Sequence, residues 1–174
     1  GKNRGKAASD SGRAARDAAR APPRTERTVD DRIAALEPVE GRFRLLKNEA
    51  LGALFDDTFS NGPASLETAL RHFDSTKLHP VGILGGIRHL GGAGPEVIDR
   101  LGPLLQAGLS ALITYGDAGR SLGDAALAAG LPPDRLKEAY TISQAGELIA
   151  ELADADTPVF IKGAAEDRLE RLAE

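Results

Sequence analysis

The sequence contains no cysteine, methionine or tryptophan, and aromatic residues make up only 4% of its 174 residues. Without cysteine, the protein can form neither a disulfide nor a thiolate metal site. Its three histidines, His72, His79 and His89, lack the spacing of a metal-binding motif. No apolar run approaches the ~20 residues that a membrane helix needs, and the N-terminus has no signal-peptide core. We therefore expect a cytoplasmic protein without a membrane span.

The absence of methionine includes the first position, Gly1, so we expect the chain to be a fragment or a processed product. The apolar share of 41% and the charged share of 28% are ordinary for a globular protein. Abundant Ala, Leu, Gly and Arg favour a bacterial source. The length allows one domain of about 130 to 150 residues and a tail, but not two full α/β domains.

Positive charge is concentrated at the N-terminus. Residues 1–28 hold eight Lys and Arg against three Asp and Glu, a net +5, whereas the whole chain carries −4. This segment has no aromatic residue on which a base could stack, so binding to nucleic acid is not expected. We predict a solvated, flexible tail or linker at 1–28, with at most a short helix at 11–21, and a folded domain at 29–174.

Beyond the tail, short apolar segments alternate with amphipathic segments of about ten residues. The pattern predicts strands at 42–47, 52–56, 81–84, 111–115, 139–142 and 159–162, and helices at 63–73, 95–107, 118–129, 144–153 and from 163 to the C-terminus. The first two strands are expected to form a hairpin, and Ser143 to cap the helix at 144–153. The fold class is therefore α/β: a Rossmann-like, mostly parallel sheet with helices on both faces, preceded by a short hairpin.

Polar residues and glycines follow four of the predicted strands. They are Asp56-Asp57, Gly85-Gly86, Gly116-Asp117 and Lys162-Gly163. In open α/β sheets, ligands bind beyond the carboxyl ends of the strands. We therefore expect these residues to share one functional rim.

Together, four stretches resemble the C-terminal domain of the Mur ligases. They read GRFRLLKNEALGALFDDTFSNGPASLETAL, VGILGGIRHLG, ALITYGDAGRSLGDAALAAG and VFIKGAAEDRLERL, and they follow the family's order over about residues 33–174. The nearest branch, which adds D-alanyl-D-alanine to UDP-N-acetylmuramoyl-tripeptide, has approximately GR…DDTYNANPDS, LGDMLELG and VKGSRGMRMERV. The resemblance implies one domain of a three-domain ligase that uses ATP and Mg to form an amide bond in peptidoglycan precursor synthesis.

The same resemblance implies partners. The central domain, with its phosphate loop, and the N-terminal domain, which holds the UDP-sugar, would have to act with this chain in cis or in trans. The stretch GKNRGKAAS is no substitute for the loop, because it lacks a preceding strand and the Ser/Thr that should follow Lys6. We expect the chain alone to be inactive and to bind neither ATP nor Mg.

The resemblance also marks rim residues that would meet the nucleotide or the substrate, although it assigns no catalytic or metal-binding residue. These candidates are Arg42, Asp57, Thr58, Asn61 and Lys162. The sequence leaves simpler roles open for them. The two adjacent aspartates could cap the helix that starts at 63, the lysine could be an exposed residue at a sheet edge, and the arginine could be a solvated strand residue.

Several positions depart from the family pattern. Phe59, Ser60 and Gly62 replace a tyrosine and two asparagines, with Asn61 displaced between them, and Gly86 and His89 replace two carboxylates. Ala164 and Ala165 replace the Ser-Arg near the incoming substrate's carboxylate, which alanine cannot grip as arginine does. Three interpretations stay open: a ligase domain, a catalytically degenerate interaction or scaffold module derived from such a ligase, and a small-molecule domain with an anion pocket at the rim.

Overall fold

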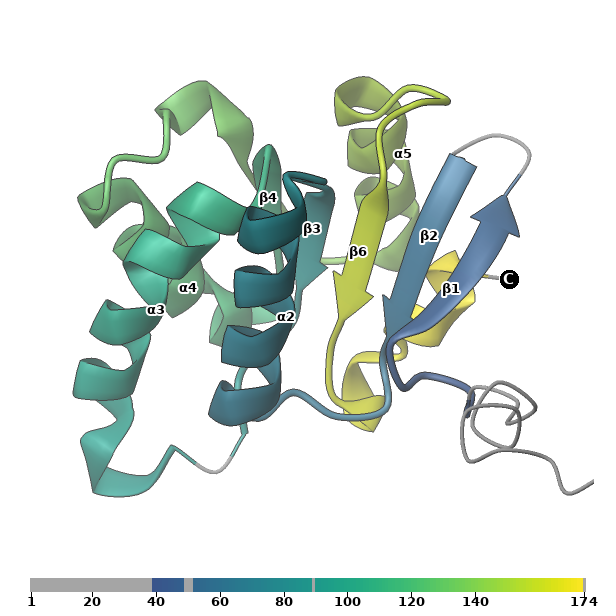
Figure 1. The fold of residues 1–174 in the computed structure, drawn as a ribbon. Helices are drawn as coiled ribbons and strands as arrows, with labels where there is room; N and C mark the ends of the chain where they lie inside the picture. Colours follow the sequence, from purple (N-terminus) through teal and green to yellow (C-terminus); the bar gives the residue numbers. More distant parts are fainter. Residues whose placement is uncertain (1–38, 49–51, 89, 174) are drawn as a thin grey trace, which may run out of the picture. The chain divides into compact units, whose positions relative to one another are not determined.

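The computed structural model describes residues 39–48, 52–88 and 90–173, which form a six-stranded sheet with helices packed on it (Figure 1). The strands are β1 (Arg44–Asn48), β2 (Gly52–Asp57), β3 (Val81–Leu84), β4 (Ala111–Tyr115), β5 (Leu136–Ala139) and β6 (Val159–Lys162). Their order is β1-β2-β6-β3-β4-β5; β1 and β2 pair antiparallel and the other neighbours pair parallel. The predicted fold class is confirmed. The predicted tail at 1–28 and its helix at 11–21 lie outside the described residues.

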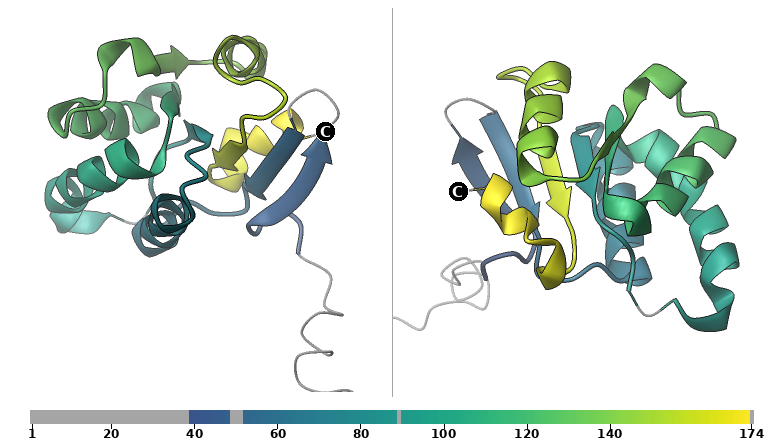
Figure 2. Two further views of the ribbon diagram at one scale, coloured as in Figure 1. Left: turned by 45° about the horizontal axis from the view of Figure 1, so that its top comes forward. Right: turned by 180° about the vertical axis from the view of Figure 1, so that it is seen from behind.

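Helices cover both faces of the sheet. On one face lie α2 (Pro63–Thr76), α3 (Gly94–Gly108) and α4 (Gly116–Ala128); on the other lie α5 (Ile142–Leu152) and the 3₁₀ turn η4 (Leu169–Leu172), which Figure 2 shows from behind. Three further 3₁₀ turns are η1 (Gly91–Ala93), η2 (Pro133–Arg135) and η3 (Ala165–Asp167). None of the helices in the described segments is long and apolar enough to cross a membrane.

The central strands supply side chains to two cores. In β3, β4 and β6, alternate residues face opposite sides of the sheet, as strand geometry requires. Leu84, Leu112 and Phe160 belong to the core under α2, α3 and α4, whereas Ile83, Ile113 and Ile161 belong to the core under α5. These three strands have the predicted bounds, because strands buried on both faces read as unbroken apolar runs.

Helix α2 begins at the predicted proline, Pro63, whose missing N–H and fixed φ suit the first helical position. The predicted inner face is buried and consists of Leu66, Ala69, Leu70 and Phe73. The helix runs three residues further than predicted and ends at Thr76, and its C-cap, Lys77, adopts a left-handed conformation. Its inner face thus fixes α2 on the sheet with its N-terminus beside the rim.

Strand β1 begins two residues later than predicted. Phe43 has a φ of +50°, in the left-handed region that bulky residues rarely adopt, so residues 42 and 43 form a turn instead of extending the strand. The turn places the Phe43 ring against an aromatic cluster, with ring centroids 5.5 Å from Phe55 and 5.7 Å from Phe73. Residues 42 and 43, which were predicted to begin the strand, therefore form a turn that the aromatic contacts hold in place.

The predicted bounds of the fifth strand and its helix are wrong. β5 precedes the predicted segment by three residues, α5 begins at Ile142, and its N-cap is Thr141 instead of Ser143. The Gln144 N–H donates to Thr141 Oγ1 at 3.2 Å, while Gln144 Oε1 accepts from the Tyr140 N–H at 2.9 Å. These reciprocal bonds fix the helix start two residues earlier than the serine would.

Thr141→Ala should therefore lower the free energy of unfolding by about 1 kcal/mol, because the α5 N-terminus loses its side-chain cap. Ser143→Ala, a matched loss of a hydroxyl two residues on, should change it by less than about 0.5 kcal/mol. Urea unfolding of both variants and of the unchanged chain measures the difference. Equal losses for the two variants would contradict the assignment of Thr141 as the cap.

The C-terminal segment is not the predicted helix. After Lys162 the chain forms η3 and η4, separated by Arg168, whose φ of +54° interrupts helical propagation. Asp167 Oδ2 accepts a hydrogen bond from the Ala164 N–H at 2.8 Å, and Leu169 is fully buried in the α5-side core. These contacts fold the segment into two short turns under the sheet.

Candidate functional site

The parallel strands bring the predicted motifs to one edge of the sheet. β6 lies between β2 and β3, and its last residue, Lys162, pairs with Asp57 of β2 and with Leu84 of β3. Leu84 in turn pairs with Thr114 of β4. The strand-end motifs therefore lie side by side along one rim, as predicted from the parallel arrangement.

Lys162 and Asp57 form an ion pair at this rim. Lys162 Nζ lies 2.5 Å from Asp57 Oδ2 and donates to the Ser60 carbonyl oxygen at 2.8 Å. The Lys162 side chain is 0% exposed and that of Asp57 14%. The alternative interpretation of Lys162 as an exposed residue at a sheet edge is wrong. Burial lowers the pKa of the Lys162 ammonium, and the hydrogen bond and charge of Asp57 oppose that shift.

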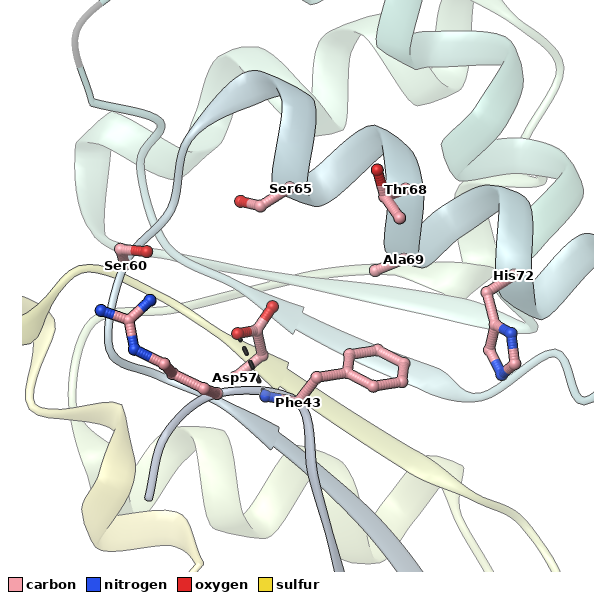
Figure 3. Close-up of a pocket in the computed structure, with 8 residues that line it drawn as sticks. Phe43, Asp57, Ser60, Ser65, Thr68, Ala69 and His72 are labelled. Atoms are coloured by element: carbon pink, nitrogen blue, oxygen red, sulfur yellow. Dashed lines mark hydrogen bonds between the residues drawn. The ribbon is translucent and has the colours of Figure 1, made fainter. Parts of the chain in front are cut away.

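Asp57 also holds the turn before β1. Its Oδ1 accepts a hydrogen bond from the Phe43 N–H at 3.2 Å (Figure 3). One carboxylate thus joins the strained turn, the end of β2 and the end of β6. The N-cap of α2 is Gly62 and has no side-chain cap, so the two aspartates do not cap this helix.

Thr58 and Asp56 form a buried layer beneath the rim. Thr58 Oγ1 donates to Asp56 Oδ1 at 2.8 Å, and the Gly41 N–H donates to Asp56 Oδ2 at 3.1 Å. Arg44 approaches the same carboxylate at 3.6 Å. Because Asp56 is 1% and Thr58 4% exposed, both residues mainly support the rim from within, and Thr58 reaches only a smaller cavity beside Gly41 and Phe59.

Asn61 connects the loop after β2 to the loop after β3. Its Nδ2 donates to the Gly85 carbonyl at 2.9 Å, and its own backbone carbonyl accepts from the Arg88 N–H at 2.9 Å. Its side chain is thus held by the Gly85 carbonyl and its backbone by Arg88, and the residue is 1% exposed. Its Oδ1 has no hydrogen-bond partner among the described residues.

Arg42 stacks on Phe59, with its guanidinium carbon 3.9 Å from the ring centroid. Phe59 is 54% exposed, so this cation–π pair forms part of the surface of the rim. In the sequence, Phe59 stands out only as a departure from the family pattern. An aromatic residue in a Gly/Ser/Asn/Pro turn of a chain with few aromatics was the signal that could have identified it.

Cavities of the size that small molecules occupy lie next to the rim, and two of them exceed 500 Å³. The Phe43 cavity, of about 520 Å³, lies between the turn before β1 and helix α2 (Figure 3), and it is lined by Arg42, Phe43, Asp57, Ser60, Ser65, Thr68, Ala69 and His72. The Arg88 cavity, of about 560 Å³, surrounds the start of α2 and is lined by residues 59–65, Arg88 and residues 164–166. Ser60 and Ser65 line both cavities.

The surface of the rim offers a hydrogen-bond donor and an aromatic ring. Arg42 can donate hydrogen bonds and Phe59 offers an exposed ring face. The described segments contain no group of three or more His, Cys, Asp or Glu that could hold a metal. The oxygens of Asp57 already accept bonds from Lys162 and Phe43. A magnesium ion would need its ligands from elsewhere.

No protein-family model matches the sequence, and no curated protein is significantly similar to it. Several solved structures contain a region whose fold is similar to that of this chain. A MurF ligase from Thermotoga maritima in complex with ADP has a TM-score of 0.65 and 17% identity, over 83% of this chain and 32% of that one. A murein peptide ligase from Psychrobacter arcticus has a TM-score of 0.55 and 15% identity, over 81% and 31%. A folylpolyglutamate synthase/dihydrofolate synthase from Yersinia pestis, complexed with AMPPNP and Mn, has 0.52 and 15%, over 78% and 31%.

The chain shares the fold of the part of these ligases that it matches. It spans about a third of the length of the ligases that it matches. The fold that the four sequence motifs predicted is therefore found in the structure. The branch of the family, the activity and the substrate stay predictions, because identities of 15 to 17% show the fold alone.

Proposed function

We propose that this chain is the C-terminal domain of a Mur-type ATP-dependent amide ligase of peptidoglycan precursor synthesis, of the branch that adds D-alanyl-D-alanine to UDP-N-acetylmuramoyl-tripeptide. One observation carries the proposal: a buried Asp57–Lys162 pair at the aligned strand ends of a Mur ligase fold. The chain's share of the matched ligases, about a third, fits one domain of three. The other two domains would supply the phosphate loop, the metal site and the UDP-sugar site.

In this function, the role of the domain is to help bind the nucleotide. Arg42 would donate to the nucleotide, and the remaining acceptor capacity of Asp57 would serve hydroxyl groups of its sugar. Lys162 would not contact the ligand; it holds Asp57 and the Ser60 carbonyl in place from below. The exposed Arg42–Phe59 pair would face the neighbouring domain or the nucleotide.

The test uses the complete open reading frame that contains this chain, expressed as one protein. We expect phosphate release from ATP that depends on both UDP-muramoyl-tripeptide and D-alanyl-D-alanine, and background release from the present chain alone. Asp57→Asn should lower kcat/KM at least tenfold, a loss of about 1.4 kcal/mol in transition-state binding, because the rim loses its organising charge. Asp124→Asn, at an exposed position on α4, is the matched control. A reading frame without a phosphate loop, whose product releases no phosphate, would refute the proposal.

A second function is favoured by a different observation. Val39 is 61% and Phe59 54% exposed beside the rim, and Ala164 and Ala165 lack the polar groups of the family pattern. An interaction or scaffold module derived from a ligase would use such an apolar surface without the chemistry. Under that function the product of the full reading frame would be inactive, and Phe59→Ala would abolish partner binding while Asp124→Asn would not.

A further inference from the structure

The sheet has two edge strands, β1 and β5, and they differ in what they expose. Among the described residues, β1 pairs only with β2, and β5 pairs only with β4. Each edge strand therefore has a row of backbone N–H and C=O groups that face away from the rest of the sheet. Such a row can form hydrogen bonds with a further strand, which is how many proteins bind extended peptides.

The edge at β5 is poorly suited to a further strand. Its sequence, Leu-Lys-Glu-Ala, has one charge of each sign, and both charges have partners within the chain. Lys137 Nζ donates to Glu151 Oε1 at 3.1 Å, and Glu138 Oε2 accepts from the Tyr140 hydroxyl at 2.8 Å. The apolar residues of β5 are partly or fully buried. This edge thus presents neither a net charge nor a large apolar side chain to a partner.

The edge at β1 exposes an apolar side chain on the face that carries α2. Leu45 is 56% exposed, although it lies opposite Phe55, which is 9% exposed and belongs to the core under α2. Phe43, in the turn before the strand, is 37% exposed. In Figure 1, β1 lies at the end of the sheet, and no helix lies over it on this face. Leu45 therefore extends the apolar surface of the core to the sheet edge, where no described helix covers it.

The charges of β1 are all positive. Arg44 and Lys47 are its only charged residues, and the nearest acidic residues in the sequence, at 40 and 49, lie outside the strand. Lys47 is exposed and lies opposite Ala53, which carries no charge. Arg44 Nη2 approaches Asp56 Oδ2 only to 3.6 Å, and the arginine side chain is 30% exposed. A second copy of β1 would bring like charges together, whereas an acidic strand would neutralise them.

We propose that the outer edge of β1 binds an extended, acidic segment of another protein as an added strand. Residues opposite each other on paired strands point to the same face of a sheet. The added strand would therefore place carboxylates opposite Arg44 and Lys47 and an apolar side chain opposite Leu45. A second apolar residue would lie opposite Leu46, which packs against the α5-side core. The complementary pattern is thus acidic, apolar, apolar, acidic.

The backbone edge favours a peptide over a nucleic acid, because only a peptide can continue the ladder of N–H and C=O groups. The inference goes beyond the proposed function and does not depend on it. It uses none of the candidate rim residues, so a ligase domain and a scaffold module could both carry this surface.

The experiment is a titration of the ¹⁵N-labelled full chain with the peptide acetyl-Thr-Glu-Val-Val-Glu-Thr-amide, whose charge pattern is the same in both strand directions. We expect saturable shifts of the amide resonances of residues 44–47, with a Kd of about 1 mM or tighter, and no shifts in β5. The same peptide with lysine in place of both glutamates should not bind. Binding of the acidic peptide should weaken as salt is added, because exposed charges are screened.

Lys47→Glu should weaken binding roughly fivefold, because an attractive charge pair across the strands becomes a repulsive one. Leu45→Thr keeps a residue suited to a strand and should weaken binding about threefold through the loss of apolar contact. Both side chains are exposed, so the variants should fold as the unchanged chain does. Lys137→Glu makes the same charge reversal on the other edge strand and is the matched control, with an expected change of less than about twofold.

Three results with the peptides and variants would overturn the inference: no saturable shifts at residues 44–47, equal binding of the acidic and the lysine peptide, or equal effects of Lys47→Glu and Lys137→Glu. A single-stranded oligonucleotide that binds residues 44–47 more tightly than the acidic peptide would identify a nucleic-acid surface instead. Shifts of the same resonances with protein concentration alone, accompanied by a dimer mass in sedimentation, would assign the edge to a second copy of the chain.

Discussion

Asp57→Asn should lower the free energy of unfolding at pH 7 by about 3 kcal/mol, whereas Lys162→Met should lower it by only about 1 kcal/mol. The asymmetry follows from burial. Removing the aspartate charge leaves a 0% exposed ammonium with the Ser60 carbonyl as its remaining partner. Removing the lysine charge leaves a carboxylate that reaches solvent and keeps its bond from the Phe43 N–H. Methionine fills most of the lysine's space, which limits the cavity.

The pH dependence of unfolding tests the same pair. The folded-state pKa of Lys162 is lowered, chiefly by burial, while the unfolded chain has the ordinary lysine value of about 10.4. Between these two values the unfolded state binds more protons, so stability rises with pH. The penalty for burying the charge is fully present below the folded-state pKa and is relieved as pH rises toward the unfolded value.

In Asp57→Asn the opposing hydrogen bond and charge are gone, so the Lys162 pKa should fall further and the stabilising effect of rising pH should begin at lower pH. Urea unfolding at several pH values from 7 to 10 measures this slope for the two variants and the unchanged chain. Lys162→Met should lack the slope. Equal losses for both variants at pH 7, with no difference in slope, would show that the ion pair has no such role.

The parts of the fold that the sequence predicted best are the most buried. β3, β4 and β6 are apolar on both faces, so their bounds follow from the residue types alone. β5 lies at an edge of the sheet, and none of its first three residues, Leu-Lys-Glu, is fully buried, so the apolar signal there was weak. The start of β1 depends on the left-handed Phe43 backbone, which is set by Asp57 and by the aromatic cluster and not by local propensity.

Some features of the candidate site could likewise be predicted from the sequence, and others could not. The position of Asp57 and Lys162 on one rim could be predicted, because parallel strands end at one edge. Their direct pairing could not, since 105 residues separate them and the sheet register decides it. Arg88 could not be found either. A single exposed arginine has no local signal, and the cavity that Arg88 lines forms only where residues 59–65 and residues 164–166 come together beside it.

Phe73→Ala should have the largest effect on stability, about 3 to 5 kcal/mol, because it removes the centre of the aromatic cluster that seats α2 on the sheet. Phe73 is 0% exposed, and its ring centroid lies 4.9 Å from that of Phe160 and 5.2 Å from that of Phe55. The Phe43 ring packs on the same cluster at 5.7 Å, so loosening it should also release the turn that lines the Phe43 cavity.

Phe59→Ala removes the same chemical group at the rim and is the matched control. Because Phe59 is 54% exposed and contacts the Arg42 guanidinium, its removal should cost no more than about 1 kcal/mol. Urea unfolding gives both values, and the amide resonances of Arg42 and Phe43 report on the turn. We expect these two resonances to broaden or shift in Phe73→Ala. A loss in Phe59→Ala as large as that in Phe73→Ala would mean that the rim aromatic is part of the core, and it could not then be a surface for a nucleotide or a neighbouring domain.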